Sequence, residues 1–158
     1  MKRIIIYYSH DGNTKLYAER IGEALSLDLI QIEPIHPIKA KGFFKIMQGG
    51  AQVTFGIKPK IRPIDTDFKE YDEIILGTPI WAGRPASPTQ SFLKNFEYKD
   101  KITSVFTLSG SGNNSKCIKF LKKKCPNIKL DVSLLDKNNE ESISNDQVLE
   151  AFLKQFTK

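Results

Sequence analysis

The most informative stretch of the chain is its beginning, where an apolar run gives way to polar residues and then to a helical pattern. Residues 4–8 are β-branched or aromatic and do not alternate with polar residues, which predicts a strand buried on both faces. Six small or polar residues, 9–14, follow, and apolar residues then recur at helical spacing from Tyr17 to Leu25. This pattern predicts a central parallel strand, a short loop and a helix packed on the sheet.

Four further segments have the patterns of strands. Residues 72–78 have an apolar centre, and residues 101–108 are rich in Thr, Val and Phe. Residues 27–33 mix apolar with polar residues, and residues 128–134 alternate between them. A mixed or alternating pattern is typical of a strand that is partly exposed, so these two segments are expected at the edges of the sheet.

Helical patterns separate these strands. Ser87 is predicted to cap a helix whose first turn contains Pro88. Another helix is expected to begin at residue 114 or 115. Ser144 and Gln147 have the spacing of a capping box, and an apolar stripe from Val148 to Phe156 follows them.

Five strands that alternate with helices predict a three-layer α/β/α fold with a doubly wound, five-stranded parallel sheet. The order 2-1-3-4-5 places the two edge candidates on the outside. Residues 1–158 are expected to form a single domain, because the chain is long enough for one core and short for two. In such a sheet a ligand binds at the carboxyl ends of the strands, here between the first and third.

The loop at residues 9–14 has the composition of a phosphate site. Backbone N–H groups of the loop and of the first helical turn point at one place, where the helix dipole adds partial positive charge. Ser9, Asn13 and Thr14 offer side-chain donors, and Gly12 permits the tight turn. The alternative is an ordinary strand-to-helix turn without a ligand.

The same stretch resembles the signature segment of the flavodoxin family. The matching positions are Ile5, Ile6, Tyr7, Ser9, Gly12, Thr14, Ala18 and Ile21. The resemblance implies that the loop binds the phosphate of FMN through Ser9, His10, Asp11, Gly12, Asn13 and Thr14. It also implies the flavodoxin fold, and flavodoxin is itself the standard example of the order 2-1-3-4-5 with FMN between the first and third strands.

Two further loops should face the same site. The loop after the third strand contributes Thr78, Pro79, Ile80, Trp81, Ala82 and Gly83. Trp81 is the only tryptophan and is expected on this loop, stacked on the isoalloxazine ring, with capping of the local core as the alternative. Arg84 follows this loop directly. Its side chain is expected either to meet negative charge on the reduced flavin or to be solvated.

The loop after the fourth strand contributes Ser109, Gly110, Ser111 and Gly112. The resemblance implies that its backbone N–H groups reach the carbonyl edge of the flavin. Family members often have a second aromatic residue here, and this chain has none, so Phe55 is a candidate for the other face of the ring. Gly110 and Gly112 also begin a dinucleotide fingerprint, but Ser115 occupies its third position, and we expect no nicotinamide site at this loop.

The segment 36–63 is too long for an ordinary connection. Residues 42–48 are expected to form the crossing helix between the second and third strands. The glycine-rich residues 49–56 either lie over the flavin or pack on the sheet, and we expect packing.

Composition adds one departure from the family. The net charge is +6 and the pI about 9.2, whereas flavodoxins are typically acidic. Apart from the run at residues 122–124, the lysines look dispersed, and no aromatic residues interleave with them, which favours a solvated surface over a nucleic-acid site. No apolar run is long enough to span a membrane, and Cys117 and Cys125 are expected to be free thiols, so we expect a cytoplasmic protein.

The sequence shows no paired carboxylates, nucleophile–base pair or metal cluster, so we predict no catalytic residue and no metal, with the chemistry supplied by FMN. The function expected is electron transfer between redox protein partners, with an acidic docking surface on the partner as one candidate. The alternative is an FMN-dependent NAD(P)H:quinone, azo or nitro reductase of the same fold. A third class, a binding module that has lost its flavin, is disfavoured by the intact first loop.

Overall fold

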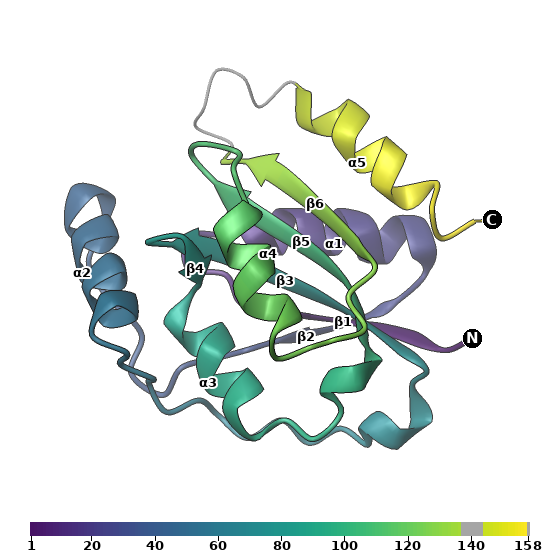
Figure 1. Cartoon of the computed structure of the whole chain (residues 1–158), viewed down its shortest axis with the longest axis horizontal. Helices are drawn as coiled ribbons and strands as arrows, with labels where there is room; N and C mark the ends of the chain where they lie inside the picture. Colours follow the sequence, from purple (N-terminus) through teal and green to yellow (C-terminus); the bar gives the residue numbers. More distant parts are fainter. Residues whose placement is uncertain (137–143, 158) are drawn as a thin grey trace.

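In a computed structural model, which describes residues 1–136 and 144–157, a parallel sheet lies between two layers of helices (Figure 1). The sheet order is β2-β1-β3-β5-β6, and each of these neighbouring pairs is parallel. The long strands are β1 (Arg3–Tyr7), β2 (Asp28–Gln31), β3 (Glu73–Trp81), β5 (Ile102–Ser109) and β6 (Leu130–Leu135). A short strand, β4 (Arg84–Pro85), pairs antiparallel with the end of β3. Numbered without β4, the order is the predicted 2-1-3-4-5.

The helices divide between the two faces of the sheet. One face carries α1 (Asn13–Leu25) and α5 (Asn145–Leu153). The other carries α2 (Gly42–Thr54), α3 (Ser87–Asn95) and α4 (Ser115–Lys122). Two 3-10 turns, Phe68–Glu70 and Lys99–Lys101, precede β3 and β5. No helix in the described ranges is both long and apolar enough to cross a membrane.

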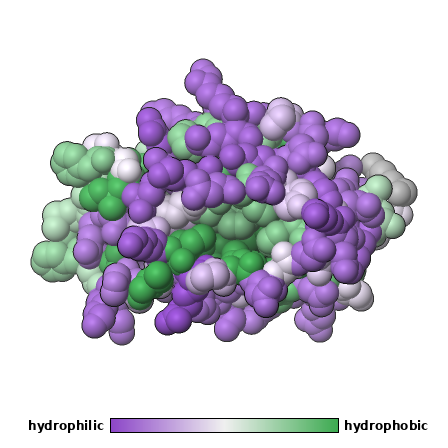
Figure 2. Space-filling model, turned by 90° about the horizontal axis from the view of Figure 1, so that it is seen from below, coloured by the Kyte–Doolittle hydropathy of each residue, from purple (hydrophilic) through white to green (hydrophobic). Residues whose placement is uncertain are grey.

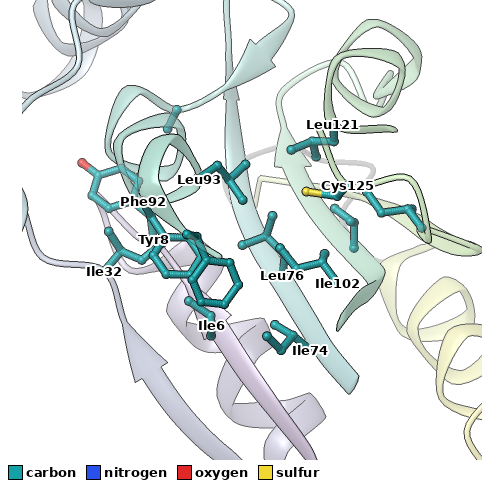
Figure 3. Packing of buried hydrophobic residues seen from close by; sticks show 14 of the residues in the cluster. Ile6, Tyr8, Ile32, Ile74, Leu76, Phe92, Leu93, Ile102, Leu121 and Cys125 are labelled. Carbon is teal, nitrogen blue, oxygen red and sulfur yellow. The ribbon is translucent and has the colours of Figure 1, made fainter. Parts of the chain in front are cut away.

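The unbroken apolar run of β1 is explained by the two cores it serves. Successive side chains of a strand point to opposite faces, so Ile4 and Ile6 enter the core under α3 and α4, while Ile5 and Tyr7 enter the core under α1 and α5. Figure 3 shows Ile6 of β1 in the first of these cores with Leu76 of β3 and Leu93 of α3. The edge strand β2, in contrast, has no fully buried residue among its four positions.

One predicted helix cap is wrong and another is confirmed only in its position. Ser87 lies inside α3, whose N-cap is Ala86, and the buried Ser87 Oγ has no hydrogen-bond partner in the described part of the chain. Ser144 is the N-cap of α5, as predicted, but its side chain makes no capping hydrogen bond to the helix. The buried Asn145 fixes this helix instead, because its Nδ2 donates to Tyr17 Oη (2.7 Å) and to the Leu135 carbonyl (2.8 Å). These contacts tie α5 to α1 and β6, which a local cap would not do. The start of α4, after Asn114, is as expected.

The crossing helix α2 is longer than the predicted range 42–48. It continues through both adjacent glycines to Thr54. Close packing favours glycine at position 49, because a Cβ atom there would lie 3.0 Å from Cδ2 of Trp81 and the indole would have to move slightly. Gly49 and Val53 are buried as the packing alternative predicts, whereas Phe55 is 78% exposed.

Cys117 and Cys125 are buried free thiols. Burial raises the pKa of Cys117 to about 12 and that of Cys125 to about 11, so both are protonated and unreactive near neutrality.

Candidate cofactor site

The loop between β1 and α1 leaves the start of the helix open to a ligand. Gly12 is the N-cap of α1 and adopts a left-handed conformation with φ of +93°, which glycine permits at no steric cost. The Gly12 N–H donates to Ser9 Oγ (3.2 Å), and this bond closes the turn. Gly12 has no side chain with which to cap α1, and the first turn contains no acidic residue. The Asn13 N–H donates to Asp11 Oδ1 (3.4 Å). The N–H groups that follow Asn13 in the first turn point out of the helix at the carboxyl end of β1, where they can receive an anion.

A pair of opposite charges lies beside this loop. Lys45 of α2 contacts Asp11 at 2.5 Å between Nζ and Oδ2. Burial alone would raise the pKa of Asp11, but the hydrogen bond and charge of Lys45 outweigh it, and the pKa lies below its usual value. Asp136, at the end of β6, lies near the same loop and accepts a long hydrogen bond from Asn13 Nδ2 (3.5 Å). Burial and the charge of Asp11 raise the pKa of Asp136.

His10 connects the loop to the chain that precedes α2. Its Nε2 lies 3.3 Å from the Ala40 carbonyl oxygen, so Nε2–H donates in the neutral tautomer that this contact selects. Its ring also meets the edge of the Trp81 ring, with centroids 6.2 Å apart. Burial lowers the pKa of His10, the Ala40 carbonyl opposes that shift, and the charge of Lys45 adds to it. His10 is therefore neutral at pH 7, and its hydrogen bond holds the first loop to the segment that precedes α2.

The residues after β3 form a hairpin, which corrects the expectation that Trp81 lies on a loop. Trp81 is the last residue of β3 and pairs with Arg84 of β4. Between them Ala82 (φ +47°) and Gly83 (φ +75°) both have positive φ, as a two-residue type I′ turn requires. The strand continues past Pro79 because this hairpin gives its end a partner. Positive φ is unusual for alanine, so Ala82 is a point of backbone strain at the tip of the hairpin.

Trp81 packs into the core rather than projecting from it. Its side chain is 8% exposed, and its ring meets Tyr8 edge-on with centroids 5.7 Å apart. Gly49 of α2 lies directly against the indole. Stacking of this ring on a flavin stays a prediction, and it is confined to whatever surface of the indole α2 and Tyr8 leave accessible.

Other residues of this segment also have structural partners. Thr78 is fully buried, and its Oγ1 lies 2.8 Å from Thr89 Oγ1 and accepts from the Ala86 N–H (3.3 Å). Pro79 and Ile80 are partly exposed. The Arg84 guanidinium lies over the Phe120 ring at 5.5 Å, so this side chain packs on α4 and is not simply solvated.

The loop after β5 is organised by its own side chains. Ser109 Oγ accepts from the Gly112 N–H (3.0 Å), and Gly112 has φ of +68°. The Gly112 carbonyl in turn accepts from Ser133 Oγ of β6 (2.7 Å). Gly110 and Ser111 are exposed between these anchors. The loop therefore presents a fixed backbone at the carboxyl end of its strand.

A cavity of about 850 Å³ lies between the first loop and the chain leading into α2. The predicted site residues that line it are Ser9, His10, Asp11 and Asn13. Its other walls come mainly from residues 33–46, with Asp136 and Arg62. The remaining predicted residues do not line this cavity: Gly12, Thr14, Thr78, Pro79, Ile80, Trp81, Ala82, Gly83, Ser109, Gly110, Ser111 and Gly112. The described chain thus brings the first loop together with α2, while the other two loops lie at the neighbouring ends of β3 and β5.

Two site residues were missed from the sequence, Lys45 and Asp136. Asp136 follows the fifth parallel strand, so the rule that places ligands at the carboxyl ends of strands was enough to include it. Lys45 has no such signal, because only the folding back of α2 brings it to Asp11.

Comparison with known proteins agrees with this architecture. The chain matches a protein from Bacteroides uniformis classed as a flavoprotein, with a TM-score of 0.79 and 21% identity over 99% of this chain and 98% of the other. A similarly classed protein from Bacteroides eggerthii gives a TM-score of 0.76 and 24% identity over 96% and 97%. A flavoprotein from Lactobacillus acidophilus, solved in complex with FMN, gives 0.66 and 23% over 93% and 97%.

At these identities the solved structures establish the fold, and no curated protein matches the chain. The decisive match is to the sequence profile of flavodoxin, which covers residues 2–154. The chain belongs to the flavodoxin family.

Proposed function

We propose that this protein binds FMN through the loop at residues 9–14 and carries electrons between redox proteins one at a time. The observation that carries the proposal is the N-terminus of α1 at the carboxyl end of β1, where a glycine N-cap leaves the helix N–H groups after that of Asn13 open to a ligand. Membership of the flavodoxin family supports the same proposal. When bound, FMN supplies the redox chemistry, and the chain supplies binding, orientation and electrostatics.

The residues of the loop fit the phosphate and ribityl part of FMN. Helix N–H groups with the hydroxyls of Ser9 and Thr14 would hold the phosphate. Asn13 Oδ1 is buried and has no hydrogen-bond partner in the described chain, and a ribityl hydroxyl is a donor of the kind it lacks. The carboxylates of Asp11 and Asp136 oppose a phosphate, and the ammonium of Lys45 offsets one of them. The site is therefore suited to a phosphate, but it carries less positive charge than the basic composition of the whole chain implies.

The other two loops are proposed to hold the isoalloxazine ring. Ala82 and Gly83 form the exposed tip of the β3–β4 hairpin, and small residues there allow close approach of the backbone. Ser109, Gly110, Ser111 and Gly112 would offer backbone N–H groups from the neighbouring strand end. Pro79, Ile80 and Trp81 complete the proposed contacts on the hairpin side, with Thr78 fixing the strand beneath them.

The reductase alternative has one observation in its favour. The cavity of about 850 Å³ adjoins the proposed phosphate loop and is large enough for a small organic substrate. Rapid turnover of NADH or NADPH with a quinone by the FMN-loaded protein would support this alternative.

The cofactor proposal is tested by titrating the FMN-free protein with FMN and, separately, with riboflavin. Riboflavin lacks the phosphate, so we expect it to bind much more weakly. Equal affinity for the two flavins would overturn the assignment of the first loop as the phosphate site.

A further inference from the structure

The outward side of α2 and the residues just after it are unusually apolar. Its exposed large side chains are Phe43, Phe44, Ile46, Met47, Phe55 and Ile57, with exposed fractions from 50% to 78%. Figure 2 shows apolar side chains at the left end of the molecule, the end at which Figure 1 places α2. Clustered exposed apolar side chains of this kind mark an interaction site.

The same part of the chain carries the whole net charge. Residues 34–64 contain six lysines and arginines and no aspartate or glutamate, while the remainder has 18 basic and 18 acidic residues. The net charge is therefore concentrated in the segment around α2, although basic residues occur along the whole chain.

Four of these cations form no ion pair with any residue that the structure describes. Lys45 pairs with Asp11 and Arg62 with Glu33. The other four, which flank α2 in sequence on both sides, are exposed and form no ion pair within residues 1–136 and 144–157: Lys39, Lys41, Lys58 and Lys60. An apolar centre with a charged rim is the arrangement of a protein interface, and Phe and Met are enriched in such centres.

The inner side of α2 contacts the proposed cofactor site. Lys45 reaches Asp11 in the first loop, and Gly49 lies against Trp81 at the end of β3. The α2 helix thus lies between that site and most of the apolar surface, while Ile46 also lines the cavity beside the first loop. A protein seated on α2 would therefore lie beside the site.

We propose that the α2 face, defined as the six exposed apolar residues above with Lys39, Lys41, Lys58 and Lys60, is the docking surface for an acidic redox protein. This inference rests on the proposed electron-transfer function and names the chemistry of the partner. Charge selects the occupant, because the four unpaired lysines attract an acidic surface and a second copy would bring the same uncompensated charge to its own face. Position selects a redox protein, because the face borders the proposed site.

The test uses the FMN-loaded full chain and two oxidised c-type cytochromes, one acidic and one basic. Binding is measured by titration calorimetry, which reports docking whether or not an electron moves. Passage of one electron from the reduced protein to ferric haem, giving ferrous haem, is followed by stopped-flow absorbance. At low salt we expect the acidic cytochrome to bind about tenfold more tightly than the basic one, with the difference closing as salt is added.

Two double variants separate the apolar and charged parts of the α2 face: Phe43→Ser with Phe44→Ser, and Lys41→Gln with Lys58→Gln. The matched control removes two exposed lysines from the end of α4, Lys122→Gln with Lys123→Gln. We expect each α2 variant to weaken binding of the acidic cytochrome about fivefold to tenfold, and the control to change it less than twofold. All six positions are exposed, and FMN content verifies that each variant is folded.

Equal binding of the two cytochromes, or an equal loss in the α4 control, would overturn the docking surface. So would α2 variants that lose only binding to anionic phosphatidylglycerol vesicles, since the occupant would then be a lipid surface, or that only dissolve a dimer in sedimentation velocity. Binding that depends on the α2 face without any passage of electrons would support the docking surface and overturn the electron-transfer function.

Discussion

The helices α1 and α2 have the same length but differ in how much of their surface is buried. Each has 13 residues and each leads away from the carboxyl end of a strand. Six residues of α1 are buried, against only two of α2. Tyr17, Ala18 and Ile21 of α1 are in the core, although Leu16 is 40% exposed. Phe43, Phe44, Ile46 and Met47 of α2 face solvent. An apolar residue in a helix is thus not in itself a sign of packing.

This difference in burial suggests that the two helices have different roles. Burial of α1 fixes the loop that precedes it, because Asn13 and Thr14 are at once the first residues of the helix and the end of the loop. In contrast, α2 is anchored by a few contacts on its inner side, and its outer side contributes little to the core. We infer that α1 serves the stability of the site and that α2 serves its communication with a partner.

The comparison predicts a large contrast in stability. Ile21 of α1 is fully buried, and Ile21→Ala should lower the free energy of unfolding by about 2–4 kcal/mol through lost packing and the cavity left behind. The matched change in α2, Ile46→Ala, removes a side chain that is 67% exposed and should change stability by less than about 0.5 kcal/mol. Urea unfolding measures both. Similar losses would show that the outer side of α2 is packed in solution.

The next effect concerns the start of α1. Thr14→Val should weaken FMN binding by about 1.5–3 kcal/mol, because it removes a hydroxyl donor to a charged acceptor. Titration calorimetry gives the affinity, and riboflavin is the control, since its binding should not change. A variant that loses affinity for both flavins equally would assign Thr14 to packing alone.

Asp136 is expected to oppose the phosphate. Asp136→Asn removes a carboxylate beside the first loop and should tighten FMN binding by about 1 kcal/mol, or about fivefold, at pH 7. The pKa of Asp136 is raised, so as the pH falls toward it the native residue becomes neutral and the difference from asparagine should disappear. Affinity measured against pH checks this, and a difference that is constant with pH would contradict it.

The smallest effect concerns the ion pair that anchors α2. The pKa of Asp11 is lowered in the folded chain, so its stabilising contribution is present above the ordinary value of 3.8 and is lost as the pH falls through the lower folded value. Because Asp11 is 43% exposed, Lys45→Met should reduce stability by less than about 1 kcal/mol at pH 7. Denaturation at pH 7 and in acid measures the loss, which should be absent in acid. A loss of equal size in acid would show that Lys45 acts through packing.

Most of the sheet could be predicted because strand patterns report burial directly. The run of β1, which is apolar on both faces, predicted its central position. The mixed pattern of β2 predicted its position at the edge. The first loop was predicted from its composition and its place between a strand and a helix. Trp81 was misplaced because its partner strand has only two residues, Arg84 and Pro85, and leaves almost no pattern. Lys45 was missed because its contact with Asp11 spans 34 residues and depends on where α2 packs in the folded chain.

The most direct test of the central claim is a stepwise, anaerobic dithionite titration of the FMN-loaded protein followed by its visible spectrum. A protein that carries single electrons between partners must hold its cofactor at the one-electron level. We therefore expect a distinct intermediate spectrum, with new long-wavelength absorbance, before full reduction. Direct two-electron bleaching, together with rapid turnover of NADH or NADPH with a quinone, would contradict the carrier function and establish the reductase in its place.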